Sequence, residues 1–308
     1  MTVYPTVQTS PVNDQRAEAG NVIAFILGMG RSGSSALARV MALCGGRLPE
    51  SLLPANPANP TGFWEPSSAI ELNARFLKAS GSSFFDTQMN QEVSEYDPLG
   101  REFVSDITAL LESCRDPASN APLIFKEPRI SVLLRFWLGA VQRTGFSPCA
   151  VIPVRHPQEV ASSLGAWKGL PPEHTAELWL KYNLLAERHT RHLPRAFISY
   201  SRLLTDWRRE IVAISAALRL TFVPNVEVDQ FLNPGLRHTI SDDEPASTKT
   251  PWLRDVYRVL SSACRDGELD FDLLDAAHDD LSQAQTAGSL PVIRSFGIDF
   301  GVPWADPE

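Results

Sequence analysis

A glycine-rich segment near the N-terminus carries the clearest chemical signal in this sequence. It reads GMGRSGSS over residues 28–35 and joins the apolar run Val22–Leu27 to an amphipathic segment that starts at Ser34. Glycines let the backbone curl so that successive amide groups point inward, and the N-terminus of a helix adds partial positive charge. A plain strand-to-helix turn would also use glycine, but the added Arg31 and the paired serines favour a cradle that binds an anion.

The same segment departs from the loop that binds ATP or GTP. Gly28 and Gly33 have the spacing of that loop, but Ser34 stands where its lysine would be, and the cation, Arg31, lies inside the loop instead. Nucleoside triphosphatases also hold Mg²⁺ with an aspartate at the end of a later strand. The sequence therefore predicts an anion site that differs from a nucleoside triphosphate site.

Positive charge follows the next two apolar runs. One ends at Lys126 and the next at Arg155, and the only acid nearby, Glu127, is flanked by Lys126 and Arg129. The site thus gathers fixed positive charge without an evident metal ligand, and no CxxC or HExxH motif occurs in the chain. Such a site suits transfer of a sulfuryl group, which carries about one fewer negative charge than a terminal phosphate and needs no metal.

Short apolar runs alternate with amphipathic segments along most of the chain, which predicts strands alternating with helices. The expected strands are Val22–Leu27, Leu123–Phe125, Cys149–Val154 and Ala196–Tyr200. The expected helices are Ser34–Cys44, Ser67–Ala79, Pro98–Cys114, Ile130–Arg143, Gln158–Trp167, Glu173–His192, Leu203–Leu218, Trp252–Cys264 and Phe271–Ala284. This order is typical of an α/β protein with a doubly wound parallel sheet, flanking helices and a helical C-terminal portion. Ligands of such sheets bind at the carboxyl ends of the strands.

The composition is that of a globular protein. The 308 residues are 44% hydrophobic and 21% charged, which excludes a disordered or collagen-like chain, and a net charge of −8 disfavours nucleic acid as the main partner. We expect a flexible tail over residues 1–20 and a single domain over residues 21–308. The first clear apolar run is far shorter than the roughly 20 residues of a membrane span. The four cysteines lie far apart, which indicates free thiols and a cytoplasmic protein.

Four motifs, in order along the chain, resemble those of the sulfotransferases that use 3′-phosphoadenosine 5′-phosphosulfate (PAPS). The loop GMGRSGSSAL is similar to the loop after their first strand, and residues 126–129, KEPR, are similar to their K[DE]P turn. Arg155 and Ser163 match the RxPxxxxxS pattern, and residues 198–204, ISYSRLL, are similar to their RYEDLL segment. Arg31 in the loop resembles the bacterial and tyrosylprotein-type branch of that family.

The resemblance implies a P-loop fold, PAPS as the donor, 3′,5′-ADP as the product, and a role for each matched residue. The residues that would wrap the 5′-phosphosulfate are Arg31, Ser32, Gly33, Ser34 and Ser35. The residues that would hold the 3′-phosphate are Arg155 and Ser163, with Arg237 as a weaker match. Tyr200 would lie beside the nucleotide.

The resemblance also implies in-line transfer to a hydroxyl or amine of an acceptor. Arg31 and Lys126 would stabilise the charge that builds on the leaving oxygen, and a carboxylate would take the proton of the acceptor. Two acids in the loop after the first helix are candidates for that base, Glu50 and Glu65. We favour Glu65, because the aromatic residues of its GFWE segment would raise its pKa by desolvation, although either acid could instead belong to a salt bridge.

Two other functions stay open on the sequence. A P-loop kinase or other phosphoryl transferase would need ATP and Mg²⁺, and the missing loop lysine argues against it. A non-catalytic nucleotide-binding protein of the same fold would not need Arg31, Lys126 and Glu65. For a sulfotransferase, the expected acceptor is a small molecule, a glycan or a lipid-linked compound.

Overall fold

The computed structural model describes residues 21–57, 59–89, 93–232, 250 and 252–293, and the expected tail over residues 1–20 lies outside them. The strands are β1 (Val22–Ile26), β2 (Leu123–Lys126), β3 (Ser147–Val154) and β4 (Arg195–Ser199). The helices are α1 (Ser34–Leu43), α2 (Ser67–Ala79), α3 (Pro98–Ser113), α4 (Ile130–Thr144), α5 (Pro157–Lys168), α6 (Pro172–His189), α7 (Tyr200–Thr205), α8 (Trp207–Leu218), α9 (Glu227–Phe231), α10 (Leu253–Asp266) and α11 (Phe271–Thr286). Strands and helices alternate through most of the chain, as predicted.

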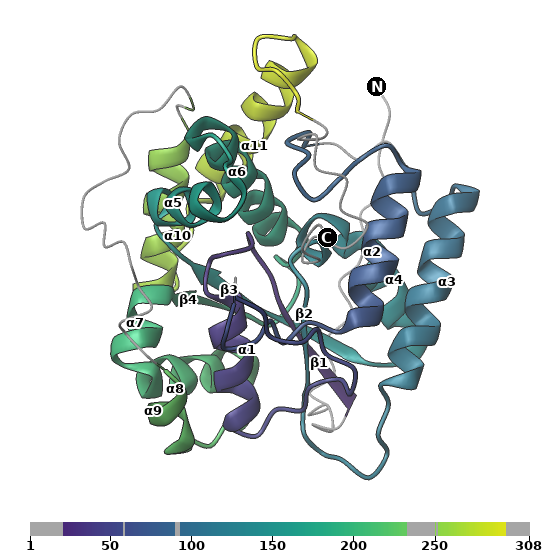
Figure 1. Ribbon diagram of the computed structural model, residues 1–308, viewed down its shortest axis with the longest axis vertical. Coiled ribbons are helices and arrows are strands. Elements are labelled where there is room, and N and C mark those ends of the chain that lie inside the picture. The colour runs from purple at the N-terminus through teal and green to yellow at the C-terminus, as the bar shows by residue number, and fades with distance from the viewer. Residues whose placement is uncertain (1–20, 58, 90–92, 233–249, 251, 294–308) are drawn as a thin grey trace, which may run out of the picture.

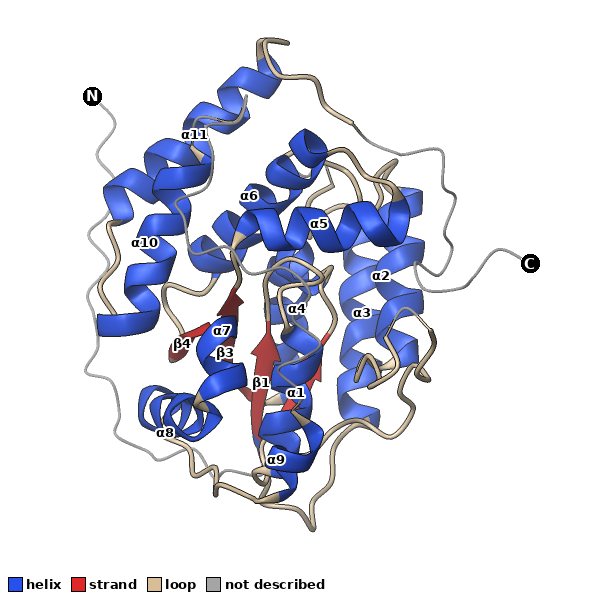
Figure 2. Ribbon diagram, turned by 60° about the vertical axis from the view of Figure 1, so that its left-hand side comes forward, coloured by secondary structure: helices blue, strands red, loops and turns tan. Residues whose placement is uncertain are grey.

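The four strands form one parallel sheet in the order β2-β1-β3-β4 (Figure 2). Strand β1 lies inside the sheet, with β2 on one side and β3 on the other. Successive residues of β1 face opposite sides, so Ile23 and Phe25 pack in one core while Ala24 and Ile26 pack in another. A strand buried on both faces needs apolar residues at every position, which is why VIAFI is apolar throughout.

Helices cover both faces of the sheet (Figure 1). Helices α2–α6, α10 and α11 contribute to the core that contains Ile23 and Phe25, and α1, α7, α8 and α9 contribute to the other core. Helices α2, α3 and α4 pack side by side. Within the described ranges, no helix combines the length and the apolar character that crossing a membrane requires. The fold class is the predicted one, an α/β protein with a doubly wound parallel sheet.

The pairing register fixes where the strand ends lie. Ile26 of β1 pairs with Lys126 of β2 and with Val151 of β3. Strand β3 continues to Val154, so Arg155 lies farther out along the strand direction than Lys126 does. The carboxyl ends of all four strands meet along one edge of the sheet, which is where ligands bind in such folds.

The structure differs from the predicted elements at Tyr200. The strand predicted over Ala196–Tyr200 ends at Ser199, and Tyr200 begins α7 instead. The Ser199 hydroxyl accepts a hydrogen bond from the backbone N–H of Arg202 at 3.4 Å and caps the helix. Tyr200 therefore lies at the carboxyl edge of the sheet, at the point where the chain leaves β4.

The helix predicted over Leu203–Leu218 is two helices, α7 and α8. Asp206 interrupts it with φ −148°, a non-helical angle, and its side chain caps α8 by accepting from the backbone N–H of Arg209 at 3.4 Å. Aspartate competes with the helical backbone for hydrogen bonds, which is why it favours such caps. The short helix α9 is also absent from the predicted elements.

The four cysteines are free thiols, as predicted. Burial raises the pKa of Cys149 and of Cys264 to about 12. Both thiols therefore stay protonated at neutral pH, which makes them poor nucleophiles.

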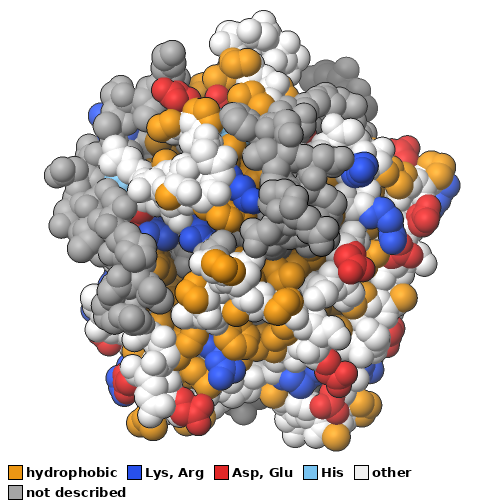
Figure 3. Space-filling model, viewed as in Figure 1, with side chains coloured by type: hydrophobic (Ala, Val, Ile, Leu, Met, Phe, Trp, Pro, Cys, Tyr) orange, Lys and Arg blue, Asp and Glu red, His pale blue; other side chains and the backbone are white. Residues whose placement is uncertain are grey.

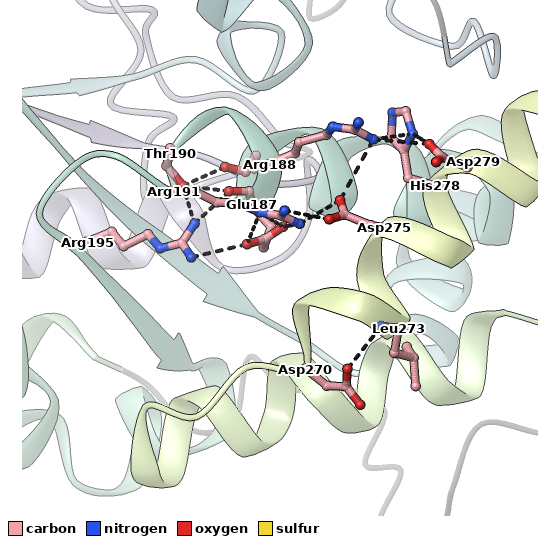
Figure 4. Close-up of polar contacts among 11 residues, drawn as sticks. Glu187, Arg188, Thr190, Arg191, Arg195, Asp270, Leu273, Asp275, His278 and Asp279 are labelled. Atoms are coloured by element: carbon pink, nitrogen blue, oxygen red, sulfur yellow. Dashed lines mark hydrogen bonds and ion pairs between the residues drawn. The ribbon is translucent and has the colours of Figure 1, made fainter. Parts of the chain in front are cut away.

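A buried carboxylate near the end of α6 contacts β4 directly and is connected to α11 through an arginine (Figure 4). Glu187 accepts hydrogen bonds from Arg191 at 2.8 Å and from Arg195, the first residue of β4, at 3.1 Å. Arg191 also donates two hydrogen bonds, of 2.8 and 2.9 Å, to Asp275 of α11. The Glu187 carboxylate thus links α6 directly to β4, and through Arg191 it is also linked to α11, which lies far along the chain.

We expect Glu187→Gln to lower the free energy of unfolding by about 2–4 kcal/mol, because it leaves two guanidinium groups without their shared carboxylate. Asp275→Asn is the matched control. The Asp275 side chain is 39% exposed, so solvent screens its ion pair, and we expect a loss below about 1 kcal/mol.

Arg191 lowers the pKa of Asp275 by hydrogen bonding. The contribution of this pair is therefore present above the ordinary carboxyl pKa and is lost as the pH falls through the lowered one. Urea unfolding near neutral pH measures the loss of stability in each variant, and its repetition at about pH 3 measures the pH dependence of the pair of Arg191 and Asp275. A Glu187→Gln protein as stable as the wild type would contradict the importance of this network.

Candidate active site

A cavity of about 540 Å³ lies at the carboxyl edge of the sheet. The glycine loop (residues 28–35), the residue after β3, helix α5 and the residues Pro57, Asn59, Pro60, Thr61 and Phe63 all contribute to its wall. The predicted site residues in its lining are Arg31, Gly33, Ser34, Ser35, Lys126, Arg155, Ser163 and Tyr200. Residues from four separate parts of the sequence therefore meet where the strand-end argument expected them.

The glycine loop turns sharply before α1. Arg31 and Gly33 both have a positive φ, +69° and +89°, which is a costly conformation for a residue with a side chain. Glycine is required at position 33 for a second reason: a Cβ atom there would lie 2.0 Å from Cδ2 of Tyr200. The start of the loop is fixed to α4, because the hydroxyl of Ser131 accepts a hydrogen bond from the N–H of Gly28 at 2.8 Å.

Arg31 reaches from the loop to helix α5. Its Nε donates to Oγ of Ser163 at 2.9 Å, and its guanidinium carbon lies 5.9 Å from the ring centre of Trp167. Burial and the nearby charge of Arg155 both lower the pKa of Arg31. Two guanidinium groups thus line one cavity and the charge of one affects the other, an arrangement that an anion would stabilise.

Arg155 is fixed on three sides. Its Nη1 donates to the backbone oxygen of Arg31 at 2.9 Å, and its Nε donates to Glu159 Oε2 at 2.9 Å. Its guanidinium carbon lies 4.5 Å from the ring centre of Tyr200. Glu159 lies in the first turn of α5, four residues after Arg155, and the two side chains form an ion pair.

Lys126 is the last residue of β2 and lines the cavity. Its Nζ donates to Oγ of Ser35 at 3.2 Å and to the backbone oxygen of Phe63 at 3.3 Å, and it forms an ion pair with Glu65. The residue is only 2% exposed and Glu65 is 0% exposed. Burial raises the pKa of Glu65, and the charge of Lys126 opposes that shift. The raised pKa agrees in direction with the prediction for this carboxyl group.

The neighbouring acid, Glu127, is held away from Lys126 by its own partners. It accepts from Arg129 Nε at 2.8 Å and from Asn73 Nδ2 at 2.5 Å, and all three side chains are buried. Among the described residues, the lining of the cavity has three cations, Arg31, Lys126 and Arg155, and one carboxylate, Glu159.

The protein as a whole is acidic, and on the face drawn in Figure 3 the Asp and Glu side chains lie mostly toward the edges. Among the described residues, no group of three or more His, Cys, Asp or Glu side chains converges as a metal site would.

Other predicted site residues do not line the cavity. Ser32 is fully buried, and its Oγ has no hydrogen-bond partner among the described residues. Glu50 is exposed, and Glu65 lies behind Lys126 rather than in the described lining. Arg237 lies outside the described residues.

Asn59 is a site residue that the sequence reasoning missed. It lines the cavity, and its Nδ2 donates to Oγ of Ser35 at 3.4 Å and to the backbone oxygen of Gly62 at 2.7 Å. The Ser35 oxygen then accepts from both Asn59 and Lys126, which uses the two acceptor positions of a hydroxyl. Its hydrogen is left to donate to a ligand. The only sequence signal was the turn-forming stretch NPANPTG.

No family model matches the chain, and no curated protein matches it. Solved structures that are similar to it include two sulfotransferase domains. The sulfotransferase domain from the Synechococcus PCC 7002 olefin synthase is 20% identical with a TM-score of 0.44, and the match covers 87% of this chain and 97% of that chain. The sulfotransferase domain from the curacin biosynthetic pathway is 19% identical with a TM-score of 0.41, over 85% of this chain and 97% of that chain.

Proposed function

We propose that this protein transfers a sulfuryl group from PAPS to a hydroxyl or amine group of an acceptor. The observation that carries the proposal is the gathering of Arg31, Lys126 and Arg155 with the glycine loop around one cavity. Two guanidinium groups and an ammonium group beside a glycine loop suit a ligand that carries several anionic groups. The acceptor would be a small molecule, a glycan or a lipid-linked compound.

The lining residues fit such a donor at both of its anionic ends. The loop amides and the free hydrogen of Ser35 would hold the 5′-phosphosulfate. Arg155 and Ser163 would hold the 3′-phosphate, with Arg31 beside Ser163. Tyr200, whose ring lies against Arg155, would contact the nucleotide. When bound, the donor supplies the sulfuryl group and leaves as 3′,5′-ADP.

Two groups of the chain would act during the transfer. The bond from sulfur to the leaving oxygen breaks while the bond from sulfur to the acceptor forms, and Lys126 would stabilise the charge on the leaving oxygen. The proton of the acceptor would pass to Glu65, whose pKa is raised by burial and whose Oε2 has no partner among the described residues. Because Glu65 lies behind Lys126, this role requires the ammonium to turn from Glu65 toward the leaving oxygen.

Ligand-dependent thermal unfolding tests the donor. We expect 3′,5′-ADP without metal to stabilise the protein, by about 2.7 kcal/mol at one hundred times its Kd. A preference for ATP with Mg²⁺ would instead favour a kinase. Incubation with labelled PAPS and a panel of hydroxyl and amine acceptors then tests transfer, and binding of 3′,5′-ADP without transfer to any acceptor would favour a non-catalytic protein.

We expect Glu65→Gln to lower turnover about 100-fold or more, because the amide cannot accept the proton of the acceptor. Its carbonyl oxygen can still accept from Lys126, so the affinity for 3′,5′-ADP should stay within about threefold. Glu50→Gln is the matched control, since Glu50 is exposed and should leave both quantities unchanged. A fully active Glu65→Gln protein would move the base to another residue. In the wild type, the rate should fall as the pH falls through the raised pKa of Glu65.

A further inference from the structure

A second cavity, of about 320 Å³, lies at the carboxyl ends of β3 and β4, against helix α10. Its lining is mainly polar, unlike the packed cores on the two faces of the sheet. The serines and arginines among its lining residues are Ser199, Ser201, Ser261, Arg155, Arg202 and Arg265. Arg202, Ser261 and Arg265 have no part in the proposed transfer reaction.

The hydroxyl groups of this cavity have hydrogens left to donate. Ser199 and Ser201 share one hydrogen bond of 3.0 Å between their oxygens, which uses one hydroxyl hydrogen and leaves the other. Ser261 of α10 has no hydrogen-bond partner among the described residues. The cavity thus offers two hydroxyl donors without matching acceptors. A ligand with several acceptor oxygens would satisfy them.

The cavity also has more guanidinium groups than carboxylates that pair with them. Arg202 donates to Glu210 at 2.7 Å, and Arg155 donates to Glu159 at 2.9 Å, so each of these guanidinium groups has one carboxylate. Arg265 donates to the hydroxyl of Ser262 at 3.2 Å and pairs with no carboxylate within the described part of the chain. The lining therefore carries one positive charge more than these two carboxylates neutralise.

We propose that the second cavity binds a free tetrahedral oxyanion, inorganic phosphate or sulfate, and that its binding weakens nucleotide binding in the first cavity. Guanidinium and hydroxyl donors around a polar hollow are the groups that recognise such ions. The ion would contact Arg265 and Ser261 from α10 and the hydroxyls at the end of β4. The effect on the nucleotide rests on the proposed function, whereas binding of the ion does not.

The two cavities share part of their walls, which provides the coupling. Arg155, Glu159 and Tyr200 line both of them. An anion in the second cavity would lie near the guanidinium of Arg155 and reduce the attraction that this group exerts on an anion in the first cavity. The coupling must be reciprocal, so a nucleotide in the first cavity would weaken the oxyanion in the second by the same factor.

Calorimetric titration of inorganic phosphate, and separately of sulfate, into the protein saturated with 3′,5′-ADP tests the proposal at constant ionic strength. Saturation removes the glycine loop as an alternative oxyanion site. We expect one equivalent of ion to bind, and Arg265→Ala or Ser261→Ala to raise its Kd about tenfold or more. Arg258→Ala is the matched control, because Arg258 is on the same helix, pairs with Asp255 and does not line the cavity. The Kd of the ion for the Arg258→Ala protein should change less than about twofold.

The coupling is measured as the Kd of 3′,5′-ADP with and without phosphate, and we expect phosphate to raise it about fivefold in the wild type and not in Arg265→Ala. Phosphate that binds only by displacing 3′,5′-ADP would overturn the second site. Equal losses in Arg265→Ala and Arg258→Ala would also overturn it, since they would indicate general screening. If 3′,5′-ADP itself fails to bind, the proposed function fails, while the dependence of phosphate binding on Arg265 in the free protein still decides the second site.

Discussion

Replacing Lys126 with methionine is expected to lower the rate of sulfuryl transfer about 100- to 1,000-fold, because one donor to the leaving oxygen is worth that much in a dry site. Lys126 suits this role because it lies in the cavity beside Ser35 and is almost fully buried. The affinity for 3′,5′-ADP should change by less than about tenfold, since the guanidinium groups of Arg31 and Arg155 remain. The rate is measured with labelled PAPS and an acceptor from the panel.

The same change has a second consequence, because it leaves Glu65 buried without its partner. Removing one member of a buried ion pair costs about 3–5 kcal/mol, and Glu65 would take up a proton to limit that cost. The double variant Lys126→Met/Glu65→Gln removes both charges and should recover most of the free energy of unfolding. It should recover none of the activity. A double variant with a near wild-type rate would show that Lys126 serves only as a partner for Glu65.

The fold was predictable because its signals are local. A short apolar run that ends in glycine, such as Val22–Leu27, is typical of a strand buried on both faces, and the segments after each strand carry a clear helical period. The errors occur where a single polar side chain decides the outcome. Asp206 breaks a helix that hydrophobic spacing would continue, and Ser199 starts a helix one residue before the expected strand end.

The candidate site was partly predictable for a geometric reason. Residues that follow parallel strands must meet at one edge, so Lys126, Arg155 and the glycine loop converge whatever the loops between them do. Contacts made by the long irregular segment after α1 were not predictable in the same way. The position of Glu65 behind Lys126 and the bond from Asn59 to Ser35 depend on how that segment folds back on the site.

The partner of Arg31 also depends on tertiary structure. The resemblance assigned Arg31 and Ser163 to opposite ends of the donor, whereas their side chains share a hydrogen bond of 2.9 Å. No spacing in the sequence relates a loop residue to a helix residue that lies so far along the chain. Which end of a donor each group holds remains a prediction for both residues.

Replacing Gly33 with alanine is expected to raise the Kd of 3′,5′-ADP more than about 100-fold, equivalent to about 2.7 kcal/mol or more. A Cβ atom at position 33 would lie 2.0 Å from Cδ2 and 2.5 Å from Cε2 of Tyr200, so the ring must move. That ring lies 4.5 Å from the guanidinium of Arg155, which itself donates to the backbone of the loop at Arg31. One methyl group would therefore disturb the wall and the loop of the cavity together.

Gly45→Ala separates this clash from plain backbone strain. Gly45 also has a positive φ, +110°, but a Cβ atom there would meet nothing within 4 Å. The Gly45→Ala protein should lose about 1–2 kcal/mol of stability and keep its affinity for 3′,5′-ADP. The double variant Gly33→Ala/Tyr200→Ala removes the clash while leaving the strain, so it should be more stable than Gly33→Ala alone. If Gly33→Ala binds 3′,5′-ADP as tightly as Gly45→Ala does, the nucleotide does not use this loop, because no ligand held by these amides could ignore a displaced Tyr200.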